Sequence, residues 1–279
     1  MKNLFTLIIM AAVLSITACR KTNQLNKPPE PPPVDTVVTE PPPPPPPPKP
    51  VYLTRIQEGI DPDLSKDTVY HLVWKDSLRI SMLVDSIKND TLVAAYNEAG
   101  YLTAVTDKGA APDNAVFTYD ANNLLTQITY SNSATTQQYV FEYTDGIVSK
   151  KSYYTATGNA ALKLSSYFTY AFTDGNITTI KAYTSSGINI ATASLTYGTQ
   201  ANPFINLCLF NYRKRLNMDD ICPFEAYFNK NIVTSLTTFG MTATLNNTFD
   251  DKQRIGQIVA DDKINQKLFT YLFNYSSAP

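Results

Sequence analysis

The sequence predicts an all-β protein: an antiparallel meander of about 13 to 15 strands that forms a strongly curved sheet or an incomplete barrel, with a short partly helical insert. Three observations predict this class. Tyr (18 residues) and Phe (13) are abundant, whereas Trp and His occur once each, and β-branched and aromatic residues favour strands. Aromatic residues alternate with polar ones before turns rich in Asp, Asn and Gly. The same unit recurs about every 23 to 29 residues.

The recurring unit is an aromatic residue followed by a turn and a second strand. The anchoring aromatics are Tyr96, Tyr119, Tyr143, Phe172 and Tyr197. Before the turn, aromatics occupy every second position, as in Phe168, Tyr170 and Phe172, which places them on one face of a strand. Asp, Asn and Gly form the turn because they tolerate positive φ. Each unit therefore predicts a β-hairpin, with second strands such as 124–130 and 177–183. A sheet of so many strands must twist, curl or close.

The N-terminus predicts export. Met1–Asn3 carries a positive charge, Leu4–Ile16 is almost wholly apolar, and small residues lead up to Cys19, which is the pattern of a secretory signal peptide over residues 1–18. The segment Ile16-Thr17-Ala18-Cys19 resembles a bacterial lipobox. That resemblance implies cleavage before Cys19, acyl chains on this residue and a membrane anchor. The alternative is an ordinary signal peptide with a chance Cys. By the same resemblance, Arg20 favours the outer membrane.

Residues 19–50 then predict a spacer, and 51–279 the β domain. Pro28–Pro50 contains a run of eight prolines, Pro41–Pro48. Such tracts adopt polyproline II, at about 3.1 Å per residue, so this stretch could hold the domain roughly 70 Å from a membrane. The alternative, a ligand for proline-reading domains, is less favoured in a secreted chain.

The insert predicted at about 202–231 breaks the alternation. Phe204–Tyr212 and Phe224–Phe228 predict short helical turns. The apolar content favours a plug that covers one end of the curved sheet core over a lid or binding segment. Cys208 and Cys222 are fourteen positions apart, so in an oxidising compartment they form either a disulfide or two buried thiols.

The hairpin unit Tyr119-Asp120-Ala121-Asn122-Asn123-Leu124 resembles the YD repeats of Rhs-type and teneurin-like proteins. The likeness covers about Leu92 to Tyr197 and returns weakly near Phe249. A further resemblance is to bacterial lipoproteins whose domain is a porin-like rolled sheet. It is carried by the lipobox, the spacer, Asn202-Pro203-Phe204 and the return strand Phe228–Val233. These resemblances imply fold and location only.

The sequence shows no recognisable set of catalytic residues. The single His71 disfavours His-dependent catalysis and His-rich metal sites. No metal, other cofactor or nucleic-acid partner is predicted, and the formal net charge is −1. Four aromatics could stack on a ligand or belong to the core: Trp74, Tyr153, Tyr154 and Tyr183. A membrane-spanning barrel is disfavoured because Glu142, Lys150, Thr178 and Gln127 fall on the face that would meet lipid.

Three functional hypotheses are compatible with these observations. The leading hypothesis is a non-enzymatic cell-envelope lipoprotein, a binding or structural module with a membrane and a glycan or another envelope protein as partners. The second is a glycan- or peptide-binding component of a nutrient-uptake system. The third is a hydrolase of envelope polymers, which requires two close carboxylates in a cleft.

Overall fold

The computed structural model describes residues 50–60, 68–86, 89–109, 114–132, 134–212, 221, 223–263 and 267–277. The predicted signal peptide, Cys19 and nearly all of the proline-rich spacer lie outside these ranges.

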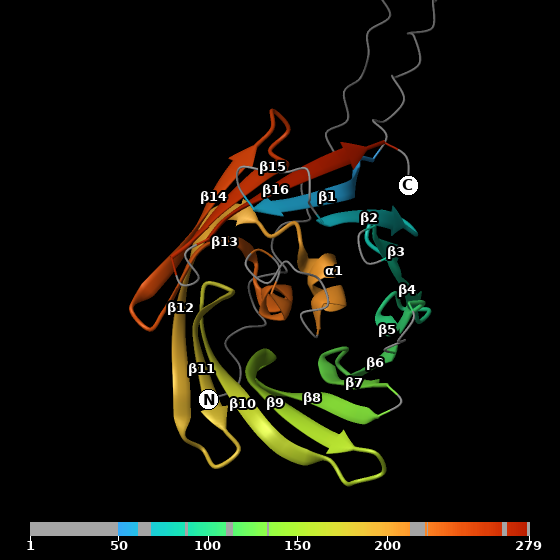
Figure 1. Cartoon of the computed structure of the whole chain (residues 1–279), viewed down its shortest axis with the longest axis vertical. Helices are drawn as coiled ribbons and strands as arrows, with labels where there is room; N and C mark the ends of the chain where they lie inside the picture. The colour runs from blue at the N-terminus through green and yellow to red at the C-terminus, as the bar shows by residue number, and fades with distance from the viewer. Residues whose placement is uncertain are drawn as a thin grey trace, which may run out of the picture. The chain divides into compact units, whose positions relative to one another are not determined.

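The described chain consists of strands and three short helical segments (Figure 1). The strands are β1 (Tyr52–Ile60), β2 (Thr68–Trp74), β3 (Ile80–Asp85), β4 (Asp90–Tyr96), β5 (Leu102–Asp107), β6 (Asn114–Tyr119), β7 (Leu125–Ser131), β8 (Thr135–Thr144), β9 (Ile147–Thr157), β10 (Lys163–Thr173), β11 (Asn176–Thr184), β12 (Asn189–Ala201), β13 (Asn231–Thr238), β14 (Met241–Phe249), β15 (Ile255–Asp262) and β16 (Lys267–Ser276). The helical segments are α1 (Ile205–Cys208), η2 (Leu209–Asn211) and η3 (Phe224–Phe228).

The strands form a closed antiparallel barrel. Each strand pairs with its neighbours along the chain, and β1 also pairs with β16. The predicted all-β antiparallel meander is confirmed. The prediction of about 13 to 15 strands is corrected to 16 strands among the described residues, and the predicted curved sheet or incomplete barrel is corrected to a closed barrel. The prediction counted strands only from Thr68 onward, so it missed β1, the strand that closes the ring.

Each anchoring aromatic stands at an irregularity in strand pairing. The register shifts by one residue next to Tyr96, Tyr119, Tyr143, Phe172 and Tyr197, and also next to Trp74 and Phe249. Such β-bulges re-aim a side chain and increase the local twist. Except at Tyr197, which lies within β12, the repeat therefore places an aromatic residue at a bulge in the last two positions of a strand, before the turn.

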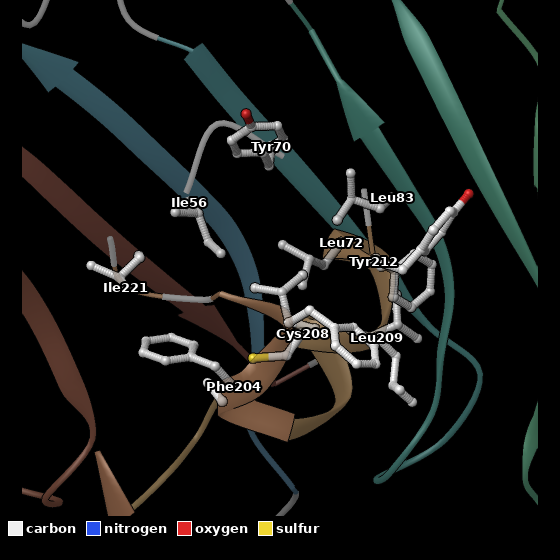
Figure 2. Close-up of a cluster of buried hydrophobic side chains, with 14 of the residues drawn as sticks. Ile56, Tyr70, Leu72, Leu83, Phe204, Cys208, Leu209, Tyr212 and Ile221 are labelled. Carbon is white, nitrogen blue, oxygen red and sulfur yellow. The ribbon is translucent and has the colours of Figure 1, made fainter. Parts of the chain in front are cut away.

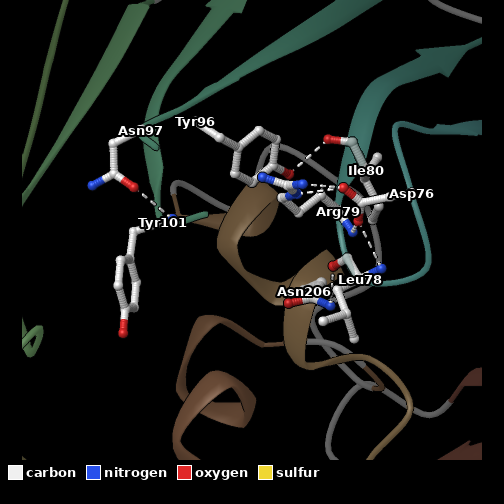
Figure 3. Close-up of polar contacts among 8 residues, drawn as sticks. All are labelled: Asp76, Leu78, Arg79, Ile80, Tyr96, Asn97, Tyr101 and Asn206. Atoms are coloured by element: carbon white, nitrogen blue, oxygen red, sulfur yellow. Dashed lines mark hydrogen bonds and ion pairs between the residues drawn. The ribbon is translucent and has the colours of Figure 1, made fainter. Parts of the chain in front are cut away.

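The hydroxyls of these aromatics bind the preceding strand. Tyr96 donates to the Ile80 carbonyl at 2.7 Å (Figure 3), Tyr119 to Leu102 at 3.0 Å and Tyr143 to Leu125 at 2.8 Å, while Tyr197 donates to Ile177. Trp74 Nε1 does the same to the Leu53 carbonyl at 2.6 Å. Burial raises the pKa of Tyr96 to about 12, so its hydroxyl remains a donor at neutral pH. These bonds join five strands to the strand before them, whereas Phe172 on β10 has no hydroxyl to do so.

Removing one such hydrogen bond is expected to lower the stability of the folded protein modestly. Tyr143→Phe leaves the Leu125 carbonyl without this donor and should lower the free energy of unfolding by about 1 kcal/mol, measured by urea denaturation. The matched control is Tyr154→Phe, for which we expect a change within about 0.5 kcal/mol. Equal effects of the two substitutions would mean that the Tyr143 hydroxyl does not stabilise the barrel.

The predicted turn chemistry is also observed. In the β8–β9 turn, Asp145 and Gly146 have φ of 51° and 77°, and in the β10–β11 turn Asp174 and Gly175 have φ of 51° and 80°. Two consecutive positive φ values define the hairpin turn that matches strand twist. The β6–β7 turn is longer, and there Asp120 Oδ1 accepts hydrogen bonds from the backbone N–H groups of Asn122 and Leu124, each at 2.9 Å.

The insert between β12 and β13 lies inside the ring of strands (Figure 1). Residues 202–212, 221 and 223–230 of this insert are named the plug. Both predicted helical turns are present, and the buried side chains include Phe204, Phe210 and Phe224. This position inside the ring agrees with the plug interpretation, and the role of a lid or binding segment stays a prediction.

An apolar seam joins the plug to β1–β3. Figure 2 shows Ile56, Tyr70, Leu72 and Leu83 of the wall gathered with Phe204, Cys208, Leu209, Tyr212 and Ile221 of the plug, all of them buried. Full burial of one such side chain contributes about 1.5–3 kcal/mol. At the rim, Asn206 Nδ2 donates to the Leu78 carbonyl at 2.6 Å (Figure 3). One side of the plug is therefore fixed to the wall.

Candidate functional site

On another side of the plug, a cavity of about 580 Å³ separates it from the barrel wall. Cavities of this size accommodate small molecules. The wall residues that line the cavity come from β8–β14, and the plug residues include Asn211, Tyr212, Phe224, Glu225 and Asn229. The cavity is therefore bounded by elements that are far apart in the sequence.

The lining is mainly apolar and has two parts. An aliphatic part comes from β11–β14 and comprises Ile180, Leu195, Val233, Leu236, Ala243 and Leu245. An aromatic part comprises Tyr139, Tyr153, Phe168, Tyr212 and Phe224. The aromatic rings also contact one another; the ring centroids of Tyr139 and Tyr153, for example, are 5.3 Å apart.

An ion pair lies among these aromatic rings. The Lys151 ammonium on β9 binds the Glu225 carboxylate on η3, and the two side chains are 7% and 16% exposed. The centroids of Phe168, Tyr139 and Phe224 lie 4.7, 5.0 and 5.6 Å from Lys151 Nζ, which suits cation–π attraction. The Tyr170 hydroxyl donates to the same carboxylate oxygen at 3.3 Å. The pair joins the wall to the plug.

The surroundings of Glu225 determine the protonation state of its carboxyl group. Burial raises the pKa of its carboxyl, but the Lys151 charge and hydrogen bond outweigh burial and hold the pKa below the ordinary value of 4.5. Glu225 is therefore ionised at neutral pH. Burial and the Glu225 charge raise the pKa of Tyr170 well above 10, so this phenol stays protonated and donates.

Asn229 is the other polar residue of interest in the lining. Its side-chain Oδ1 accepts the Ile177 backbone N–H at 2.8 Å, which fixes the amide orientation and leaves Nδ2 as a donor. Asn229 is 2% exposed, and its buried Nδ2 lies beside the Tyr197 hydroxyl, to which the amide donates.

The four predicted stacking residues do not form one site. Tyr153 lines the cavity. Trp74 ends β2 and its ring centroid lies 5.8 Å from that of Tyr52. Tyr154 follows Tyr153 and so points to the opposite face of the wall. Tyr183 stacks on Tyr167, with centroids 4.8 Å apart and ring planes 8° apart. Ligand stacking by these residues stays a prediction.

The two predicted partners of the disulfide cannot both be placed. Cys208 in α1 is buried within the apolar seam of Figure 2, whereas Cys222 lies outside the described residues. The disulfide and the alternative of buried thiols both stay predictions. Among the residues that are described, no group of three or more His, Cys, Asp and Glu side chains is arranged to hold a metal. No helical membrane span occurs in the described ranges.

Sequence reasoning did not single out Lys151, Glu225 or Asn229. Counting back from Tyr153 by twos places Lys151 on the inner face, but counting forward from Val148 places Lys150 there. The register resolves the conflict: Glu142 pairs with Lys150 and Tyr143 with Val148, so Ser149 is the extra residue of a bulge. Only the alternating aromatics that end at Tyr143, on the partner strand β8, could have indicated which of the two lysines points inward.

Comparison with known proteins identifies the fold. No family model matches the chain, and no curated protein matches it significantly. Among solved structures, it is similar to a porin-like protein from Bacteroides uniformis, with 12% sequence identity, a TM-score of 0.50 and coverage of 80% of this chain and 96% of that one. A porin-like protein from Bacteroides vulgatus matches with 11% identity, a TM-score of 0.43 and coverage of 81% and 99%. At such identities, the first match shows a shared barrel fold and nothing further.

Proposed function

We propose that this chain is a non-enzymatic lipoprotein of the cell envelope whose barrel binds a small, mainly apolar molecule between wall and plug. The observation that carries the proposal is the cavity of about 580 Å³ with its aliphatic and aromatic lining. The anchor at Cys19 and the proline-rich spacer would hold this binding domain away from the membrane, most simply the outer membrane.

The outer face of the barrel supports a position outside the bilayer. A spanning barrel carries an apolar band on its outer face. Here many exposed positions of several strands are polar or charged, as in Thr118, Glu142, Lys181, Thr192, Thr196, Thr244 and Asn246, beside a few exposed apolar side chains such as Val116 and Ile190. Lys150 and Glu142 form an ion pair on this face, with Nζ and Oε1 2.7 Å apart.

The alternatives have less support. A polymer hydrolase requires two facing carboxylates, one with a raised pKa, whereas among the described lining residues the one carboxylate is Glu225, and its pKa is lowered. A glycan-binding surface requires free ring faces. Tyr167 lies against Tyr183, and Lys150 Nζ lies 5.3 Å from the Tyr167 centroid, so these rings already contact each other and a cation.

A neutral fluorescent probe tests cavity binding. N-phenyl-1-naphthylamine should gain fluorescence on binding the full chain, and Ala243→Phe, which fills the cavity, should weaken binding by about tenfold or more. The matched control is Ala171→Phe, which adds the same ring at an exposed position of β10 and should leave binding unchanged. Circular dichroism checks that both variants fold. Equal probe binding by the two variants would contradict the proposed function.

A further inference from the structure

Charge in the cavity is confined to one ion pair. Among the described residues that line the cavity, only Lys151 and Glu225 carry a charge. The Lys151 ammonium contacts the Glu225 carboxylate directly, and the Tyr170 hydroxyl donates to the same carboxylate oxygen at 3.3 Å. The two charges therefore neutralise each other.

The two partners of this pair come from different parts of the molecule. Lys151 belongs to β9 of the wall, whereas Glu225 belongs to η3 of the plug. The wall alone would present to the cavity an ammonium group beside the rings of Tyr139 and Phe168, which is a site for the anionic head group of an amphiphile. The plug fills this site with a carboxylate of its own.

Displacing Glu225 from Lys151 is unfavourable. The two side chains are largely buried, at 16% and 7% exposed. An anionic ligand that bound Lys151 would leave the Glu225 carboxylate without its counter-ion, and a cationic ligand that bound Glu225 would do the same to Lys151. Because an unpaired buried charge is strongly unfavourable, the pair disfavours both kinds of ligand.

The aliphatic part of the lining also disfavours a charged group. It presents six apolar side chains from β11–β14 to the cavity. A charged head group buried against them would lose its hydration and gain no counter-ion, whereas a hydrocarbon chain is stabilised by the same contacts. The lining as a whole therefore favours an uncharged ligand with a hydrocarbon chain.

We propose that Glu225 determines the charge selectivity of the cavity: by binding Lys151 from the plug, its carboxylate excludes fatty-acid-like anions and restricts the site to uncharged amphiphiles such as long-chain alcohols. This inference rests on the proposed function, since it names the ligand class of the same cavity. Glu225 then has a role in specificity that is separate from its contribution to stability.

Ligands with the same alkyl chain and different head groups test the selectivity of the wild-type protein. At neutral pH, 1-decanol, decanoate and decylammonium each compete with N-phenyl-1-naphthylamine bound to the full chain, below the concentration at which each forms micelles. We expect decanoate and decylammonium to bind at least about tenfold more weakly than 1-decanol. A decanoate affinity equal to that of 1-decanol would overturn the inference.

Removal of the carboxylate assigns the selectivity to Glu225. Glu225→Ala leaves Lys151 without a counter-ion and leaves room beside it for the carboxylate of a ligand. Decanoate should then bind at least about tenfold more tightly than 1-decanol, a reversal of the wild-type order, and should raise the melting temperature of this variant. The matched control is Glu142→Ala, which removes the same group from the outer-face ion pair with Lys150 and should retain the wild-type order.

A second variant keeps the test independent of whether Glu225→Ala folds. Glu225→Gln fills the same space without the charge, so it should lose the discrimination against decanoate and keep that against decylammonium, which Lys151 still repels. If a folded Glu225 variant keeps the wild-type discrimination against decanoate, the inference is wrong and cavity binding stands. If neither the probe nor any of the three compounds binds the wild type, both the inference and the proposed function are wrong.

Discussion

Lys151→Met is expected to lower the free energy of unfolding by about 3–5 kcal/mol, the range measured when one member of a buried ion pair is removed. Met retains much of the Lys stem but leaves Glu225 on the plug without its counter-ion, inside a shell of aromatic rings. Urea denaturation followed by circular dichroism measures the change. The plug should also become more open to hydrogen exchange near Glu225, because the ion pair joins η3 to β9.

The neighbouring residue provides the control. Lys150 forms an ion pair with Glu142 on the outer face, where solvent screens the charges. Lys150→Met should therefore change the free energy of unfolding by less than about 1 kcal/mol. A double variant, Lys151→Met with Glu225→Met, should recover most of the stability lost in the single variant, since apolar replacements of both partners are often neutral or stabilising. Equal effects of Lys150→Met and Lys151→Met would show that the buried pair does not hold the plug.

The pH dependence gives a second measure of the same pair. The pKa of Glu225 is lower in the folded protein than its ordinary value of 4.5. The pair therefore contributes stability that is present above about pH 4.5 and is lost as pH falls through the lowered folded pKa. The stability difference between the wild type and Glu225→Gln should shrink over that acidic window. A difference that stays constant there would contradict an ionised Glu225.

The local parts of the fold were predictable, because their causes are local. The aromatic alternation on β8 and β10 and the Asp-Gly corners at 145–146 and 174–175 determine hairpins through steric and hydrogen-bonding preferences of adjacent residues. No local sequence pattern indicates that the sheet closes into a barrel. Closure depends on β1 pairing with β16, as in Ile56 opposite Phe273, and β1 contains a register shift after Leu53 and a buried Glu58 that obscure its alternation.

The candidate site was predictable only in part, for the same reason. Tyr153 was singled out and does line the cavity, because an aromatic on the inner face follows from alternation. Lys151 was hidden by the bulge at Ser149, which shifts the inward phase by one residue. Glu225 and Asn229 lie in the plug, where irregular backbone gives no period, and their roles depend on contacts with β9 and β11. Functional side chains on such segments require the tertiary structure.

The proposed acylation of Cys19 predicts that removing this residue moves the whole protein from the membrane to the soluble fraction. Each buried methylene contributes about 0.8 kcal/mol to anchoring, and many exposed positions of the described barrel wall, such as Thr118 and Lys181, are polar. The test is Cys19→Ala carried behind an ordinary cleavable signal peptide, so that an uncleaved leader cannot serve as an anchor. Fractionation and mass spectrometry of the N-terminal peptide measure the location and the acyl mass.

The control for this experiment is Cys208→Ala, which removes a buried Cys side chain of the plug and should leave the protein on the membrane. The outcome also distinguishes a barrel that spans the membrane from a barrel that is tethered to it. A porin-like barrel that spans the bilayer would stay with the membrane after Cys19→Ala and require detergent for release. A tethered barrel would be released, because Glu142, Lys150 and the Thr-rich outer positions of β12–β14 interact better with water than with hydrocarbon. Retention of the Cys19→Ala protein would therefore contradict the anchor and the position of the barrel outside the bilayer together.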